Sequence, residues 1–285
     1  MSRPNILYVT DLTYTANGRV YRDEDLMLSA RLGEHFDITR CDPRAAETLM
    51  TGFDGVVVRN SGPVIHYRDE YDSFRVAALK SGIPVFNELS GRADMIGKQY
   101  LVDLSRAGAA VIPTVDHRND LGRLPAADTY VVKPKIGSDS IGMITLADLE
   151  PATLQRSGVF LDGSMLVQPT IDFVHEASFY FVDHALHYAL FAPEPTRRWK
   201  LVPFTPSAGD IEFAQWFVDW NTIDHGIQRV DACRTADGEL SVMEVEDLNP
   251  YLSLDVVDGA TATRFIDAMR RSIEALLASH GMFAG

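Results

Sequence analysis

The sequence has 285 residues, of which 46% are hydrophobic and 9% are aromatic. A chain of this length and composition can fill the cores of two or three subdomains, which excludes a tail or a linker. Its 40 acidic and 26 basic residues leave a formal net charge of −14, which opposes a nucleic-acid backbone and argues against nucleic acid as a partner. A small anion is still allowed, because a few local cations and a metal can hold it.

The cysteine content and the hydropathy pattern favour a cytoplasmic protein. Cys41 and Cys233 are too few and too far apart for a disulfide framework or a zinc site, so we interpret them as buried hydrophobic side chains. The apolar stretch at residues 6–9 meets Asp11 directly, without the basic start and longer apolar core of a signal peptide. No apolar run approaches the roughly 20 residues that span a bilayer, so we expect no membrane contact.

Residues 1–90 alternate short β-branched runs with helical patterns, which predicts a parallel sheet. Residues 69–80 carry an apolar face and are followed by Gly82, which predicts a helix closed by a left-handed glycine. The strands of this first domain are expected at residues 6–10, 36–40, 55–59 and 83–86.

A small central subdomain is expected at residues 91–163. Residues 94–106 predict a helix with Ile96, Leu101 and Leu104 near one face. A strand is expected to follow at residues 129–133.

A C-terminal subdomain is expected at residues 164–285, where strand patterns dominate and predict an antiparallel sheet. Residues 179–182 and 186–191 flank a turn and therefore indicate a hairpin. The apolar face that recurs across residues 265–277 predicts a final amphipathic helix with a structural role.

The segment VVKPKIGSDSIGM, residues 131–143, combines two lysines with a loop rich in glycine and serine. Glycine lets backbone amides approach an anion closely, serine hydroxyls add donors, and lysine supplies a charge for phosphate oxygens. The order of residues matches neither a P-loop nor a Rossmann turn. Taken alone, the segment is either a polar hairpin turn or a phosphate-binding loop of another fold.

A second polar group lies in a predicted hairpin at residues 228–246. Because side chains alternate along a strand, Arg229 and Asp231 share one face, and Glu244 and Glu246 share one face of the neighbouring strand. Oxygen ligands that lie close together suit magnesium, which also keeps waters and phosphate oxygens in its shell. A solvated acidic hairpin is the alternative, which the apolar residues of the second strand weaken, since unpaired acids are costly in an interior strand.

These motifs together resemble the ATP-grasp superfamily: a lysine–proline strand with its glycine and serine loop, then a distant R-x-D strand and an E-x-E strand. Their layout is similar to that of D-alanine–D-alanine ligases and glutathione synthetases, over about residues 98–249. The resemblance implies an α/β (α+β) ATP-grasp fold, in which a parallel-sheet pre-ATP-grasp domain precedes a small central subdomain and an antiparallel C-terminal domain. It also implies ATP and Mg²⁺ as cofactors and a carboxylate–amine ligase as the activity.

The resemblance implies a nucleotide site that spans the central and C-terminal subdomains. Gln168 would meet the adenine amino group, the backbone near Ile171 the ring edge, and Glu176 the ribose hydroxyls. The residues that match the family's ATP-binding positions are Lys98, Lys133, Gly137, Ser138, Ser140, Gln168, Ile171 and Glu176. A surface lysine remains the alternative for Lys98, and a solvated strand acid for Glu176.

The implied metal ligands are Asp231, Glu244 and Glu246, with Arg229 and Lys133 as catalytic residues beside the transferred phosphate. The family commonly has asparagine where this chain has Glu246, so the number of metal ions and the ligand set stay open. The implied reaction has two steps. A carboxylate attacks the γ-phosphate of ATP, and an amine then displaces phosphate from the acyl phosphate.

The substrate is expected to be small and amino-acid-like, because no carrier-binding or peptide-binding extension is evident. Arg59 follows a predicted strand, at the end of an open sheet where ligands bind, and Arg198 and Asn249 are further candidates for substrate contacts. Arg59 and Arg198 could equally lie at the solvated surface.

Three activities remain open at this stage. One is ring closure of O-amino-D-serine to D-cycloserine in antibiotic biosynthesis. The others are an intermolecular ligase that forms a dipeptide or modifies a peptide, and a nucleotide-binding module without turnover. A homo-oligomer, either a dimer or a tetramer, would agree with the family.

Overall fold

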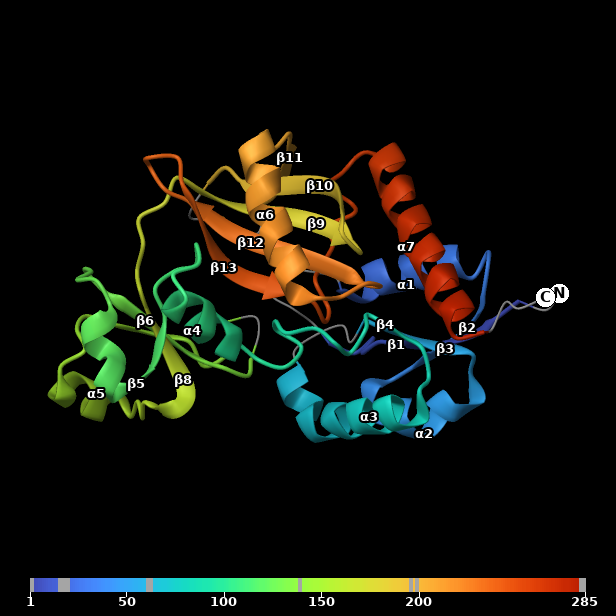
Figure 1. The fold of residues 1–285 in the computed structure, drawn as a ribbon, viewed down its shortest axis with the longest axis horizontal. Coiled ribbons are helices and arrows are strands. Elements are labelled where there is room, and N and C mark those ends of the chain that lie inside the picture. Colours follow the sequence, from blue (N-terminus) through green and yellow to red (C-terminus); the bar gives the residue numbers. More distant parts are fainter. Residues whose placement is uncertain are drawn as a thin grey trace.

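The computed structural model describes residues 3–14, 21–59, 64–137, 140–194, 197 and 200–281. Within these ranges the chain forms one parallel and two antiparallel sheets, which Figure 1 shows with their covering helices. The mixed class and the arrangement of sheets that were expected from the sequence are confirmed. No helix in the described part of the chain is long and apolar enough to cross a membrane.

The N-terminal sheet is parallel, with the strand order β2-β1-β3-β4. Its strands are β1 (Asn5–Val9), β2 (Asp37–Cys41), β3 (Gly55–Val58) and β4 (Val85–Phe86). The helices are α1 (Tyr21–Leu32), α2 (Ala46–Leu49) and α3 (Arg68–Ser81), with short 3-10 turns at Pro43–Ala45, Met50–Gly52 and Val64–Tyr67. Gly82 ends α3 with φ of 69°, which is the left-handed conformation that was expected from the sequence.

The central sheet is antiparallel, with the order β5-β8-β6-β7. Its strands are β5 (Val115–His117), β6 (Tyr130–Pro134), β7 (Ile144–Leu146) and β8 (Asp162–Pro169), accompanied by α4 (Gln99–Arg106), a 3-10 turn at Arg118–Arg123 and α5 (Pro151–Ser157). Strand β8 crosses residue 164 and pairs with β5 and β6. The division into residues 1–90, 91–163 and 164–285 stays a prediction.

The predicted start of the central helix is wrong, because α4 begins at Gln99 instead of residue 94. Gly97 has φ of 102°, which interrupts a right-handed helix. The backbone N–H groups of Ala93 and Met95 donate to the carboxylate of Asp247, at 3.1 and 2.7 Å, and so leave the helical pattern. Ile96, expected on the apolar face, is 44% exposed.

The C-terminal sheet is antiparallel, with the order β11-β10-β9-β12-β13. Its strands are β9 (His175–Val182), β10 (Ala185–Ala192), β11 (Val202–Phe204), β12 (Ile227–Arg234) and β13 (Leu240–Glu246), and its helices are α6 (Ala208–Asn221) and α7 (Gly259–Ser279). Both hairpins that were predicted for this region are therefore confirmed.

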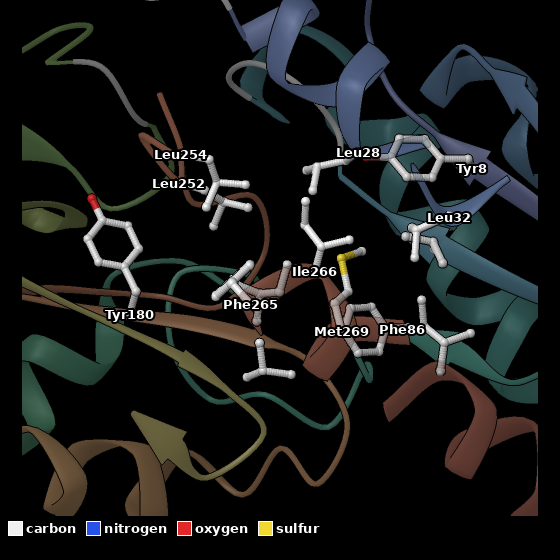
Figure 2. Packing of buried hydrophobic residues seen from close by; sticks show 14 of the residues in the cluster. Tyr8, Leu28, Leu32, Phe86, Tyr180, Leu252, Leu254, Phe265, Ile266 and Met269 are labelled. Atoms are coloured by element: carbon white, nitrogen blue, oxygen red, sulfur yellow. The ribbon is translucent and has the colours of Figure 1, made fainter. Parts of the chain in front are cut away.

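A buried cluster joins the N-terminal sheet to the C-terminal sheet through α7, as Figure 2 shows. Tyr8 and Phe86 contribute from the first sheet, Tyr180 from the second, and Phe265 and Met269 from α7. Burying a large apolar side chain contributes about 1.5–3 kcal/mol. The cluster therefore fixes the two sheets relative to each other, and the prediction that α7 is structural is confirmed.

Candidate nucleotide and metal site

The β12–β13 hairpin brings together the charged residues that the sequence singled out. Arg229 lies opposite Glu246, and Asp231 lies opposite Glu244, with a register shift just after Asp231. All four residues lie at the end of the hairpin that is remote from its turn. The hairpin register therefore places the three carboxylates and the guanidinium at the same end of the strand pair, and their role as a metal site stays a prediction.

Arg229 is 7% exposed and is held by three groups. Its Nε and Nη2 donate to Asp231 at 2.9 and 2.7 Å, and Nη2 also donates to Glu246 at 2.5 Å. Its Nη1 donates to the carbonyl of Tyr251 at 2.9 Å. These hydrogen bonds fix the orientation of the planar guanidinium, and a lysine ammonium could not be held in the same way.

Two lysines from different elements converge on Glu244. Lys133, on β6, lies 3.2 Å from the Glu244 carboxylate, and Lys98, at the start of α4, lies 3.4 Å from it. Lys98 also donates to Asp94 at 2.5 Å and is only 3% exposed. Lys98 is therefore not a surface lysine.

The carboxylates of this site differ in their affinity for protons. Burial would raise the pKa of Glu244, but Lys98 and Lys133 hold it at about 2. Burial raises the pKa of Glu246, and the nearby Asp231 adds to this shift, while Arg229 opposes it. A bound cation would relieve the unfavourable charge on Glu246.

The donor chemistry of the site fits magnesium, since Asp231, Glu244 and Glu246 offer hard oxygen ligands. Within the ranges that the structure describes, however, no group of three or more His, Cys, Asp or Glu side chains is already arranged to hold a metal ion. The carboxylates instead face Arg229 and the two lysines. To bind a metal ion, the carboxylates would have to give up some of these hydrogen bonds and turn their oxygens toward the ion.

We expect Glu244 to make stability depend on acid pH. Because its folded pKa of about 2 lies below its ordinary value of 4.5, its contribution is present above pH 4.5 and is lost as the pH falls toward 2. The free energy of unfolding should therefore fall more between pH 5 and pH 3 in the wild-type protein than in Glu244→Gln. Denaturant titrations without metal measure this difference, and equal losses in both proteins would contradict the assignment.

The loop between β6 and β7 occupies the position of the expected phosphate loop. Ser140 has φ of 60° and Gly142 has φ of 73°, so the chain turns sharply here. A Cβ atom added to Gly142 would lie 3.0 Å from Pro134 Cγ, which favours glycine at this position. Gly137 is half-buried at the start of the loop, whereas Ser138 lies outside the described residues.

The expected adenine and ribose residues lie on the connection between the central and C-terminal sheets. Gln168, on β8, is 5% exposed and donates its amide to Thr114 Oγ1 at 2.9 Å, which orients its carbonyl oxygen. Ile171 lies in the segment after β8, and Glu176 lies near the start of β9, opposite Cys233. The contacts of these residues with ATP stay predictions.

The structure does not place Arg59 as an open carboxylate clamp. Its side chain is 2% exposed and is bound inside the protein by Glu24, Asp25 and the Pro250 carbonyl. Its position at the end of β3 was expected, but its acidic partners on α1 were not. Arg198 lies outside the described residues.

Sequence reasoning missed two acids that organise the site. Asp94 accepts hydrogen bonds from Lys98 and from the Tyr100 hydroxyl, at 2.5 and 2.9 Å. Asp247, fully buried directly after β13, accepts from two backbone N–H groups of the segment before α4. The four-residue spacing of Asp94 and Lys98 could have indicated an ion pair. The place of Asp247 directly after a buried strand was a weaker indication of its role.

Solved structures with the same fold include ATP-grasp ligases. The D-alanine–D-alanine ligase from Bacillus anthracis, complexed with ATP, matches with a TM-score of 0.65 at 13% identity, over 99% of this chain and 100% of that one. The ATP-grasp ligase PsnB, complexed with a precursor variant, Mg and ADP, matches with a TM-score of 0.64 at 14% identity, over 94% and 98%. No family model matches the chain.

Fold and site together define the class that the chain resembles: it has the fold of ATP-grasp ligases. The sequence is also 28% identical to the cycloserine biosynthesis protein DcsG of Streptomyces lavendulae, in a match that covers 63% of this chain and 70% of that protein. The crystal structure of the D-cycloserine synthetase DcsG matches with a TM-score of 0.70 at 22% identity, over 94% of this chain and 99% of that one. The expected resemblance to ATP-grasp ligases is confirmed, and ATP, Mg and ADP are present in the solved structures of these neighbours.

Proposed function

We propose that the chain joins a carboxylate to an amine through an acyl phosphate, on a small amino-acid-like substrate. The observation that carries this proposal is the convergence of cations and carboxylates beside the β12–β13 hairpin, next to the loop between β6 and β7. Lysines there suit the phosphates of ATP, and the carboxylates suit its magnesium ion. The similarity to ATP-grasp ligases supports the same reaction.

In this proposal, each cation of the site has a separate task. Lys98 and Lys133 bind the phosphates of ATP, and Arg229 offsets the charge on the phosphoryl group in transfer. Magnesium, when bound with ATP, supplies further positive charge to the phosphates. The bond from Arg229 Nη1 to the Tyr251 carbonyl involves no metal ligand, so it can hold the guanidinium while Asp231 and Glu246 turn toward the ion.

A small pocket beside the phosphate loop supports a small substrate. It is lined by Val64, Ile65, Arg68, Asp94, Met95, Gly97, Ile136, Gly137, Leu248 and Asn249. The Nε of Arg68 donates to Asp72 at 2.7 Å, and this pairing fixes the orientation of its guanidinium. We propose that Arg68, instead of Arg59, offers an arginine to a substrate carboxylate, with Asn249 lining the same pocket.

For the substrate itself, we propose O-amino-D-serine, whose carboxylate and aminooxy group can close into the ring of D-cycloserine. The similarity to the cycloserine biosynthesis protein favours this choice over a dipeptide-forming or peptide-forming ligase. A cytoplasmic location and a homo-oligomer remain predictions.

The experiment that tests this function is ADP release with Mg-ATP across O-amino-serine and D- and L-amino acids, with the product mass recorded. Loss of one water from a single substrate supports ring closure, whereas a mass that joins two substrates supports an intermolecular ligase. ATP binding without ADP release for any substrate would contradict the proposed turnover.

We expect Lys133→Met to weaken ATP binding by at least about tenfold, since a charge-assisted contact to phosphate contributes about 1.5–3 kcal/mol. Isothermal titration calorimetry with a non-hydrolysable ATP analogue measures the effect. Lys80→Met, which removes an exposed lysine at the end of α3, serves as the matched control and should bind as the wild type does. Equal affinities for all three proteins would remove Lys133 from the nucleotide site.

A further inference from the structure

The segment between β13 and α7 contains residues 250–254, which we call the strap. Two arginines from different subdomains bind successive carbonyls of the strap. Arg59, at the end of β3, donates from Nη1 to the Pro250 carbonyl at 3.0 Å. Arg229, on β12, donates from Nη1 to the Tyr251 carbonyl at 2.9 Å. The strap therefore connects the buried Arg59 to the arginine of the proposed phosphoryl-transfer site.

A buried carboxylate holds the strap from the side of α1. Glu24 accepts hydrogen bonds from the backbone N–H groups of Leu252 and Leu254, at 2.9 and 3.5 Å. The Tyr188 hydroxyl, on β10, donates to the Leu252 carbonyl at 2.7 Å. Leu252 and Leu254 also belong to the buried cluster of Figure 2. Polar contacts and apolar packing thus fix the strap on both sides of Tyr251.

Arg59 and Glu24 form one unit inside this cluster. The Arg59 guanidinium donates to Glu24 at 3.2 Å and to Asp25 at 3.0 Å. Asp25 also accepts from the hydroxyl of Thr10 at 2.6 Å. The three charged side chains are between 1% and 8% exposed, so loss of one leaves the others buried and incompletely paired.

We propose that Arg59 and Glu24 are positioning residues that hold the strap so that the Tyr251 carbonyl directs Arg229 toward the transferred phosphate. A buried pair of acids around an arginine is a weak source of stability, which leaves positioning of the strap as a reason for the arrangement. The unit lies at the end of the parallel sheet. Because it binds the strap, and the strap binds Arg229, it links the position of that sheet to the position of the hairpin. This inference rests on the proposed function only for the role of Arg229.

Two substitutions that preserve size test the inference: Glu24→Gln, and Arg59→Lys, which cannot reach all three partners. Both should lower kcat by about tenfold or more while the KM for ATP changes less than about threefold, since small misplacements of catalytic groups reduce rate strongly. Ser272→Ala is the matched control. It removes buried contacts of α7 with Asp183 and His225, at 2.6 and 3.0 Å, without touching the strap.

A second measurement does not depend on turnover. Nuclear magnetic resonance can follow the exchange with water of the Arg229 Nη1–H protons, which donate to the Tyr251 carbonyl and are assigned by their absence from Arg229→Lys. Exchange should be at least about fivefold faster in Glu24→Gln and Arg59→Lys than in the wild type and in Ser272→Ala, because a looser strap frees the guanidinium.

The two measurements separate the possible failures. Unchanged exchange at Arg229 in both folded variants would overturn the positioning role, whatever the activity. Equal losses of kcat in Ser272→Ala and in the two variants would also overturn it, since any buried polar contact would then have the same effect. If the wild type releases no ADP with any substrate but the exchange rates differ as expected, the proposed ligase function fails and the positioning inference stands.

Discussion

Glu244→Gln is expected to abolish turnover, with kcat reduced by more than about a thousandfold, because electrostatic stabilisation at the reacting group is usually the largest catalytic contribution. Glutamine can offer magnesium only a neutral oxygen. The same change leaves Lys98 and Lys133 without the carboxylate that now lies 3.4 and 3.2 Å from them. Steady-state ADP release measures the loss, and circular dichroism verifies that the fold is kept.

The control for this substitution is Glu239→Gln, an exposed acid directly before the same strand, β13. It should retain wild-type kcat, since its side chain lies at the turn of the hairpin. Turnover of Glu244→Gln within about threefold of the wild type would remove Glu244 from the metal site.

Arg229→Lys should lower kcat by about a hundredfold, which is the scale expected when one preorganised donor of the reacting group is lost. A lysine keeps the charge but cannot span Asp231, Glu246 and the Tyr251 carbonyl as the guanidinium does. The KM for ATP should change little, because Lys98 and Lys133, which we propose to bind the phosphates, remain. Initial-rate kinetics over a range of ATP concentrations separates the two parameters.

Arg234→Lys is the matched control for Arg229→Lys, since it makes the same change on the same strand. Arg234 pairs with Asp210 at 2.6 Å and with the Gly238 carbonyl at 2.7 Å, near the turn of the hairpin. Its substitution should leave kcat unchanged. A similar fall in kcat for both variants would mean that Arg229 acts on the stability of β12 instead of on phosphoryl transfer.

The elements that the sequence predicted well are those with a strong local pattern. The alternation of side chains predicted the β12–β13 hairpin. It also predicted that Arg229 and Asp231 share one face, and that Glu244 and Glu246 share one face. The repeated apolar face gave α7, and Gly82 gave the end of α3. Local periodicity and cap residues are sufficient for such features because their partners lie within a few residues.

The features that the sequence did not predict depend on contacts between distant residues. The segment before α4 is shaped by Asp247, which lies more than 150 residues away along the chain. Arg59 was expected at a sheet end, but its partners on α1 and at Pro250 arise only from the packing of the N-terminal sheet on the strap. No local spacing carries that information, so an arginine of this kind is easily assigned to substrate binding.

The central claim is that a substrate carboxylate is activated as an acyl phosphate, and oxygen labelling tests it most directly. O-amino-D-serine carrying ¹⁸O in both carboxyl oxygens would be turned over with unlabelled Mg-ATP, and the released phosphate analysed by mass spectrometry. One carboxyl oxygen bonds to the γ-phosphorus and leaves with phosphate when the amine attacks, so the phosphate should contain one ¹⁸O atom and the product carbonyl the other. Phosphate without ¹⁸O, formed together with the product, would contradict the acyl-phosphate reaction.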